Sequence, residues 1–342
     1  MIRMKGWTEL FRPNRVYGTV CQNMLFKAAI ALGAGLASAL LFFIPMKGTT
    51  AAMLLAFAGP LPIMIAGLGF GSITSFAAIA SGAAVLAVAL TPALALFFVL
   101  TLALPAALLA YLAARRRDVA LDDSEETISI PLYSKGQMLG WVAVLSAMIA
   151  LVPFTVMAMR GMDVDDTARQ LAPAIRTFFQ GEANIPYSMS AREFARMAVL
   201  AFPAMFAASS TLMMAFNLWL AAKVARASGA MAPQDSDIPF ELRLPRDGLW
   251  VLFAAIVACA LGEVPRAIAS TLAASFFTAY ALHGLAVVHG FLRGNPVRAA
   301  LLFGLYALIA MMAWPLLIAA AIGMFDSLVP LTRHRASPPA TA

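Results

Sequence analysis

The chain has 342 residues, of which 62% are hydrophobic and 12% are charged. No soluble core could bury so much apolar surface, so the composition excludes an ordinary soluble domain and indicates an integral membrane protein. The formal net charge of +7 raises the question of nucleic-acid binding. The basic residues lie in intervals that flank apolar segments, where membrane orientation and anionic headgroups account for them, so we expect no nucleic-acid partner.

The N-terminal segment, residues 1–25, is polar and basic and has no apolar stretch followed by a small-residue cleavage site. We therefore expect a cytoplasmic segment without a removable signal peptide. Apolar runs of about 20 residues, enough to cross a bilayer, then recur through a membrane domain at 26–324. The predicted spans are 26–44, 50–66, 70–90, 93–113, 138–159, 197–221, 248–262, 267–288 and 298–324. They predict an all-α fold, a polytopic integral membrane helical bundle of eight or nine transmembrane helices.

The span count depends on 248–262, whose roughly 15 residues fall short of the usual minimum of about 17. With nine spans, the polar tail at 325–342 lies outside the cell. If 248–262 is re-entrant, the count is eight and the tail is cytoplasmic, and both alternatives stay open.

The distribution of Lys and Arg predicts the orientation. With the N-terminus in the cytoplasm, fifteen of the 24 Lys and Arg residues fall in cytoplasmic intervals. The positive-inside rule therefore favours a cytoplasmic N-terminus.

Two polar intervals interrupt the spans. Residues 114–136 carry a basic and then an acidic cluster and are expected to form a cytoplasmic loop. Residues 160–196 form the longest extracytoplasmic segment, and apolar residues recur there at helical spacing, at Ala168, Leu171, Ala172, Ile175, Phe178 and Phe179. This pattern predicts an amphipathic helix that lies on the outer membrane surface or caps a cavity.

Three helix starts carry capping signals. Thr91-Pro92 and Asn295-Pro296 place a capping side chain before a proline at the first helical position. Ser190 and Glu193 have the spacing of a capping box before the sixth span.

The second span contains Pro60 and Pro62. Each proline removes a backbone donor, so freed carbonyls must find partners on neighbouring helices or in a wet cavity. Broken helices of this kind often line transporter binding sites, which makes both prolines candidate substrate-binding residues. Prolines are also common in membrane helices without any such role.

Small residues in the first span form overlapping small-xxx-small pairs, at Gly33, Gly35, Ala37 and Ser38. Such pairs let two helices approach closely. We expect these residues to pack a helix or dock a partner, and the second helix can belong to this chain or to another subunit.

Polar groups inside the predicted spans are few. Asn217 lies in the sixth span, and Tyr280 and His283 lie one turn apart in the eighth. We take all three as candidate substrate-binding residues. His283 is either a hydrogen-bonded structural histidine or a contact for a substrate or a proton.

Catalytic signals are missing from the sequence. No Asp or Glu falls at the centre of a predicted span, which argues against ion pumps and proton antiporters. The chain also has no HExxH and no GxSxG pattern, and Cys21 and Cys259 form no metal-ligand spacing. We therefore expect no enzyme activity, no catalytic residue, no metal and no cofactor.

The order of these features resembles the YybS-like bacterial membrane proteins, the family of domain of unknown function 2232. The resemblance rests on the basic N-terminus, on Pro60-Leu61-Pro62-Ile63, on the stretch 281–289 (ALHGLAVVH) and on Gly323-Met-Phe-Asp326 followed by Arg333. The chain departs from the pattern at 328–331 (LVPL), where a second aspartate is expected.

The resemblance implies a multi-pass protein of the bacterial inner membrane whose first part looks like the substrate-binding subunits of energy-coupling-factor transporters. Those subunits dock on a transmembrane coupling subunit through small-xxx-small faces, and Gly33 with Ala37 is the nearest match.

Two functional hypotheses follow. The first is a transporter-like substrate-binding membrane subunit for a small, largely uncharged metabolite, working with a coupling subunit and ATPases. The alternative is a non-transporting membrane scaffold or a component of a biogenesis complex. In both cases the lipid bilayer is the surrounding partner.

Overall fold

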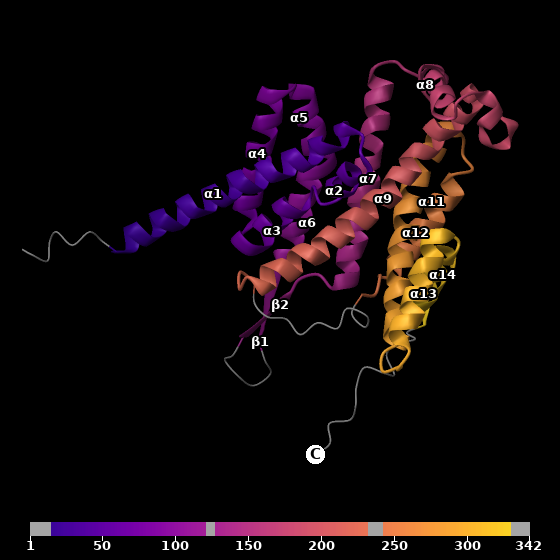
Figure 1. Cartoon of the computed structure of the whole chain (residues 1–342). Coiled ribbons are helices and arrows are strands. Elements are labelled where there is room, and N and C mark those ends of the chain that lie inside the picture. The colour runs from indigo at the N-terminus through magenta and orange to yellow at the C-terminus, as the bar shows by residue number, and fades with distance from the viewer. Residues whose placement is uncertain (1–14, 121–126, 232–241, 330–342) are drawn as a thin grey trace, which may run out of the picture. The chain divides into compact units, whose positions relative to one another are not determined.

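A computed structural model of the chain describes residues 15–120, 127–231 and 242–329 (Figure 1). The chain divides into two compact units. The first comprises the residues up to Tyr111 together with Leu220–Ala232, and the second comprises Leu112–Trp219 and the residues from Pro233 onward. The long helix α9 (Ala191–Ala227) contributes to both units.

The first unit is built from helices, which are α1 (Arg15–Phe43), η1 (Ile44–Lys47), α2 (Thr50–Ala56), α3 (Leu61–Phe70), α4 (Ser72–Ala89), α5 (Pro92–Phe98), η2 (Val99–Ala103, one π-helical turn) and most of α6 (Leu104–Ala114). The second unit contains β1 (Arg116–Ala120), β2 (Thr127–Pro131), α7 (Lys135–Met159), α8 (Val164–Phe178), η3 (Glu182–Asn184), η4 (Pro186–Ser188), most of α9, α11 (Asp247–Ala258), α12 (Glu263–Phe291), α13 (Arg298–Met311) and α14 (Pro315–Leu328).

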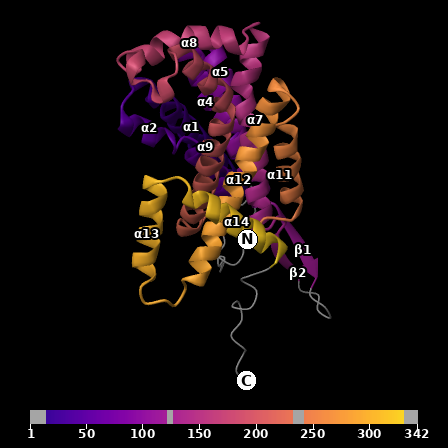
Figure 2. The ribbon, with the colours of Figure 1, turned by 90° about the vertical axis from the view of Figure 1, so that its right-hand side faces the viewer.

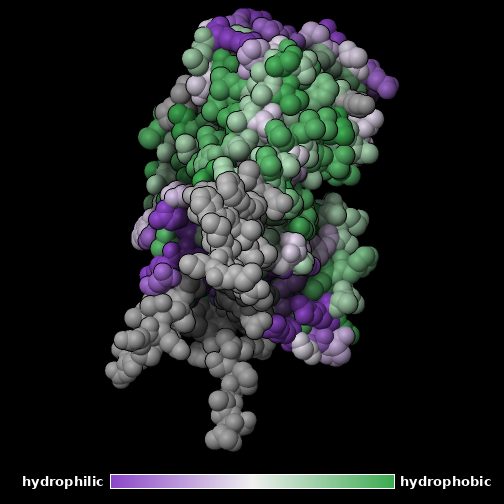
Figure 3. All heavy atoms as spheres, turned by 90° about the vertical axis from the view of Figure 1, so that its left-hand side faces the viewer, coloured by the Kyte–Doolittle hydropathy of each residue, from purple (hydrophilic) through white to green (hydrophobic). Residues whose placement is uncertain are grey.

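Seven helical segments of the described residues are long and apolar enough to cross a membrane. They are Met24–Met46, Thr50–Phe70, Ser72–Ala89, Pro92–Ala114, Lys135–Val156, Ala191–Ala227 and Arg266–Phe291. Hydrophobic side chains make up much of the face drawn in Figure 3, as expected of a surface that meets lipid. The all-α membrane fold is confirmed.

The span count overlaps the predicted eight or nine at eight. Within the described ranges, seven helices are long and apolar enough to cross a membrane, or eight if α13 and α14 are counted together as one span. α11 has only 12 residues, about 18 Å of helix, so the predicted span 248–262 is replaced by a helix too short to cross a bilayer.

The predicted span 298–324 is also divided. α13 and α14 are bent by 118° at a break that follows Met311, and Pro315 begins the second helix (Figure 2). The proline suits a first helical turn because its missing N–H has no partner there. The bend lets α14 turn back and pack along α12.

In the first unit, α1 and α4 cross at two glycines. A Cβ atom on Gly35 would overlap the Ala78 carbonyl and the Ser81 hydroxyl, and one on Gly82 would lie 2.7 Å from the Gly35 oxygen. Gly35 is therefore used for packing within this chain. Gly33 is exposed, and a Cβ atom there would meet nothing within 4 Å.

The proline-rich part of the second predicted span is a break between α2 and α3. Pro60 is the N-cap of α3, and Pro62 lies in its first turn. The Ser38 hydroxyl on α1 donates to the Gly59 carbonyl over 2.8 Å. A neighbouring helix thus satisfies a carbonyl at the break, which is one of the two solutions expected from the sequence.

The capping signals had mixed outcomes. Thr91 accepts from a backbone N–H at the start of α5, and Ser190 and Glu193 form the predicted capping box. Asn295 does not cap a helix, because α13 begins at Arg298 and the asparagine stabilises the turn before it.

The interval 114–136 is more ordered than the expected loop. β1 and β2 form an antiparallel pair with Arg116 opposite Pro131 and Ala120 opposite Thr127. The strands are the exception to the all-α expectation. The acidic cluster at 122–126 lies outside the described residues.

The predicted amphipathic helix is α8, which begins at the N-cap Asp163. Its Ala168 and Ala172 pack against Ala191 and Ala195 of α9. Phe178 is 80% exposed, so only part of the apolar stripe is covered within the second unit.

Candidate functional site

A histidine and an aspartate meet inside the second unit. The His283 Nε2 of α12 lies 3.0 Å from the Asp326 Oδ2 of α14, and each residue is only 1% exposed. An ionised carboxylate can only accept, so in this contact the imidazole Nε2 carries the hydrogen. A buried carboxylate is costly to build, which makes this pair a candidate for function.

The pair can form because two glycines let the helices touch. A Cβ atom on Gly284 would overlap the Ala319 carbonyl and lie 3.0 Å from the Gly323 nitrogen. A Cβ atom on Gly323 would overlap the Tyr280 carbonyl. Backbone therefore meets backbone where α12 crosses α14, as in other small-residue crossings in membranes.

Arg243 joins this pair from the segment before α11. Its Nε lies 3.8 Å from the Asp326 Oδ2, and its Nη2 donates to the Asp326 carbonyl over 2.8 Å. We call Arg243, His283 and Asp326 the ion cluster.

The same segment caps the end of α14. Arg246 donates to the Ser327 carbonyl over 3.2 Å and to the Leu328 carbonyl over 2.8 Å. The last carbonyls of a helix have no partner within it, and positive charge at that end is favourable. The two arginines supply both the donors and the charge.

Two hydroxyl groups add further bonds to this segment. The Ser327 hydroxyl lies 3.2 Å from the Leu244 carbonyl and donates to it, and the Tyr280 hydroxyl donates to the Pro245 carbonyl over 3.3 Å. The backbone at Arg243 also passes so close to α7 that a Cβ atom on Gly136 would overlap it. The segment from Arg243 to Arg246 is therefore fixed from several sides.

The protonation state of the ion cluster follows from its hydrogen bonds. Arg243 and Asp326 balance each other in charge. The His283 Nδ1 is buried and has no hydrogen-bond partner among the described residues. A hydrogen on that atom would be an unpaired buried donor, so the arrangement favours a neutral imidazole.

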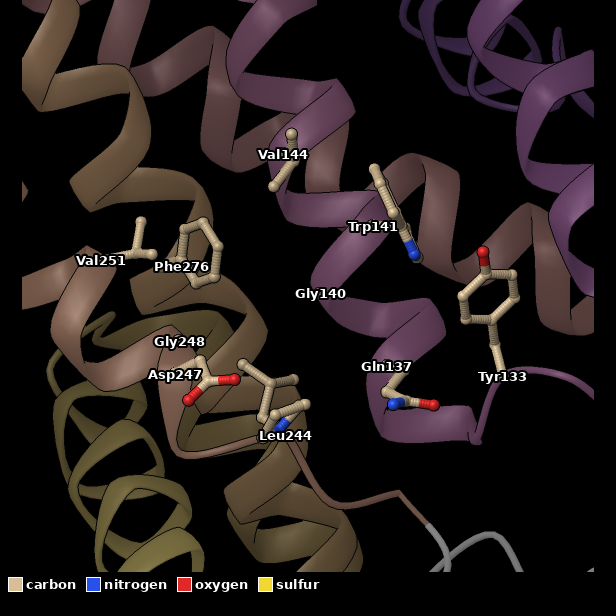
Figure 4. A pocket seen from close by; sticks show the side chains of 11 residues that line it. Tyr133, Gln137, Gly140, Trp141, Val144, Leu244, Asp247, Gly248, Val251 and Phe276 are labelled. Carbon is tan, nitrogen blue, oxygen red and sulfur yellow. The ribbon is translucent and has the colours of Figure 1, made fainter.

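An open groove lies on the other side of this segment. It has a volume of about 330 Å³ and runs between α7 and the start of α11 (Figure 4). Its lining residues are Tyr133, Gln137, Gly140, Trp141, Val144, Leu244, Pro245, Asp247, Gly248, Val251 and Phe276. Most of these side chains are aromatic or aliphatic, and Gln137 and Asp247 add an amide and a carboxylate.

The aromatic rings give the groove its flat surfaces. Tyr133 and Trp141 meet edge to face with their ring centres 6.3 Å apart, and Phe276 of α12 is buried. A mostly apolar site with a few polar groups is typical of small-molecule binding.

The predicted site residues fall in different places. Pro60 and Pro62 belong to the first unit, whereas Asn217, Tyr280 and His283 belong to the second. Asn217 is buried in α9, where its amide donates to the Met213 carbonyl over 2.8 Å. None of the three polar residues lines the groove.

Tyr280 and His283 do contribute to one polar network, through Pro245 and Asp326. Arg243 and Asp326 are site residues that the sequence did not predict. The sequence sign that could have pointed to Asp326 was the motif Gly323-Met-Phe-Asp326. Its aspartate is the first charged residue after an apolar run.

No group of three His, Cys, Asp or Glu side chains that could hold a metal ion occurs among the described residues.

A protein-family model described as a predicted membrane protein, domain of unknown function 2232, matches residues 36–327. No curated protein and no solved structure matches the chain.

Proposed function

The chain belongs to the family of membrane proteins with domain of unknown function 2232, and we propose that it is the substrate-binding membrane subunit of a transporter. It has no catalytic activity of its own in this proposal. The observation that carries the proposal is the groove between α7 and α11, which combines aromatic walls with an amide and a carboxylate. These groups suit a small, largely uncharged metabolite.

The energy for transport comes from other proteins in this proposal. The sequence contains no phosphate-binding loop followed by a lysine, so ATP would be hydrolysed by a partner. A transmembrane coupling subunit with ATPases would fill that role.

The proposed membrane is the bacterial inner membrane, with the N-terminus in the cytoplasm. The start of α11 follows a basic interval, and its arginines bond the last carbonyls of α14. The end of α14 therefore lies beside Arg243 and Arg246. The positive-inside rule assigns the interval that contains these arginines to the cytoplasm. This supports a cytoplasmic tail, with the bent α13–α14 pair counted as the eighth span.

Filling the groove tests its role. A Cβ atom on Gly140 meets nothing within 4 Å, so Gly140→Phe places a ring in the groove without a clash at the first carbon. We expect the Gly140→Phe variant to carry about tenfold less co-purified metabolite than the wild type, as measured by mass spectrometry. This corresponds to a loss of ~1.4 kcal/mol in the free energy of binding.

The matched control is Gly304→Phe on α13, where a Cβ atom also meets nothing within 4 Å. It lies outside the groove and should keep the metabolite. A wild-type protein that carries no metabolite, or a Gly140→Phe variant that carries as much as the control, would contradict the proposal.

The second candidate function, a membrane scaffold, is favoured by one observation. Gly33 leaves an open small-residue position on α1. We expect Gly33→Leu to remove a docked partner from pull-downs in mild detergent, while Gly304→Leu keeps it. A partner set of ATPases and a coupling subunit supports the transporter, a cell-envelope complex supports the scaffold, and an unchanged partner set argues against docking at Gly33.

A further inference from the structure

We propose that His283 and Asp326 form a buried proton-binding site, and that loading it with a proton releases the end of α14 from the segment before α11. This inference goes beyond the proposed function. It requires no ligand in the groove, so it can stand or fail by itself.

The proton would bind at one of two atoms. The lone pair of the His283 Nδ1 takes up a proton from hydronium, which leaves water, and no bond within the protein is broken. The net charge of the ion cluster then rises from zero to +1. Alternatively, a proton binds an Asp326 oxygen and removes the charge that balances Arg243. Each outcome places uncompensated positive charge in a buried site, which is strongly unfavourable.

Arg243 is the partly exposed member of the ion cluster. The Arg243 side chain is 31% exposed, whereas the side chains of His283 and Asp326 are 1% and 2% exposed. The guanidinium therefore links the buried pair to solvent. A proton would enter past Arg243 rather than through the packed face of α12 and α14.

The charged groups around the pair come from four elements. α14 supplies Asp326, the segment before α11 supplies Arg243 and Arg246, α11 begins with Asp247, and the one ionisable residue of α7 is Lys135 at its first position. Three of these five groups are basic. The carboxylate of Asp326 is the charge that balances Arg243.

Loading the site would weaken contacts that extend beyond the pair. The arginines bond three successive carbonyls of α14, at Asp326, Ser327 and Leu328. If Arg243 turns toward water, the Asp326 carbonyl loses its donor, and of its bonds to arginine the last turn of α14 keeps only those to Arg246. The segment that would move also supplies Leu244 and Pro245 to the groove wall.

Hydrogen–deuterium exchange of α14 tests the inference. The full-length protein in lipid nanodiscs is compared at about pH 8 and about pH 5, on either side of the usual histidine range. His283→Gln is the matched variant, because glutamine can donate to Asp326 but cannot take up a proton. Since both proteins share the intrinsic pH dependence of exchange, the ratio of their rates isolates the effect of the histidine.

We expect equal exchange at pH 8 and exchange at least about tenfold faster in the wild type at pH 5, which corresponds to ~1.4 kcal/mol. Asp326→Asn should exchange fast at both pH values. The proposal is overturned if neither wild type nor His283→Gln exchanges faster at pH 5 than the intrinsic pH dependence accounts for, or if α14 stays protected in Asp326→Asn. Equally accelerated exchange in wild type and His283→Gln would place the proton on Asp326. The metabolite measurement on Gly140→Phe is separate, so either proposal can fail alone.

Discussion

Gly284→Ala is expected to destabilise the protein by roughly 3 kcal/mol, near the upper end of what overpacking costs. The new Cβ atom would overlap the Ala319 carbonyl oxygen and crowd the backbone nitrogen of Gly323. Backbone cannot rotate away as a side chain can, so α12 and α14 must move apart. The separation would also lengthen the contact between His283 and Asp326.

The measurement is the thermal unfolding of the purified protein in mild detergent, followed by size-exclusion chromatography. Gly304→Ala is the control, because it makes the same change in a helix where a Cβ atom meets nothing within 4 Å. Alanine favours a helix over glycine by up to about 1 kcal/mol, so this control should be neutral or stabilising. Equal melting of the two variants would show that the helices do not cross at these glycines.

Asp326→Ala is expected to cost about 3–5 kcal/mol, because it removes one partner from a buried ion pair. Arg243 would lose its counter-charge and His283 its acceptor. The free energy of unfolding can be measured by denaturant titration in detergent. Asp166→Ala provides the comparison, since Asp166 pairs with Arg169 on an exposed face of α8 and should contribute less than about 1 kcal/mol.

A double variant separates lost charge balance from lost packing. Arg243→Met with Asp326→Leu removes both charges, and we expect it to be more stable than Asp326→Ala alone. If the double variant and Asp326→Ala are equally unstable, the uncompensated arginine is not the cause. If Asp326→Ala lowers the free energy of unfolding no more than Asp166→Ala does, Asp326 does not form a buried ion pair.

The membrane fold could be predicted because hydropathy is a local property of the sequence. The bend between α13 and α14 could not, since the apolar run continues through the break and Pro315 resembles the other prolines of the spans. The hairpin of β1 and β2 was also missed. Its strands are five residues each and lie beside clusters of charge that mask any alternation.

The ion cluster shows a different limit of prediction from sequence. His283 and Tyr280 were selected because each is a polar residue in an apolar span, which is visible locally. Their partners are 43 and 35 residues away in sequence, and nothing in a helical pattern links such positions. Asp326 was assigned to the polar tail as the first charge after an apolar run, although it is buried in α14.

The cap on α14 has a consequence for biogenesis. Arg243 bonds a carbonyl that lies 83 residues later in the chain. During synthesis the earlier helices are made first. Both arginines therefore stay without their carbonyl partners, in contact with water, until α14 has been translated and has folded back. A chain stopped before α14 would therefore lack the carbonyls that these arginines bond, so the cap forms only after the last helix has been made.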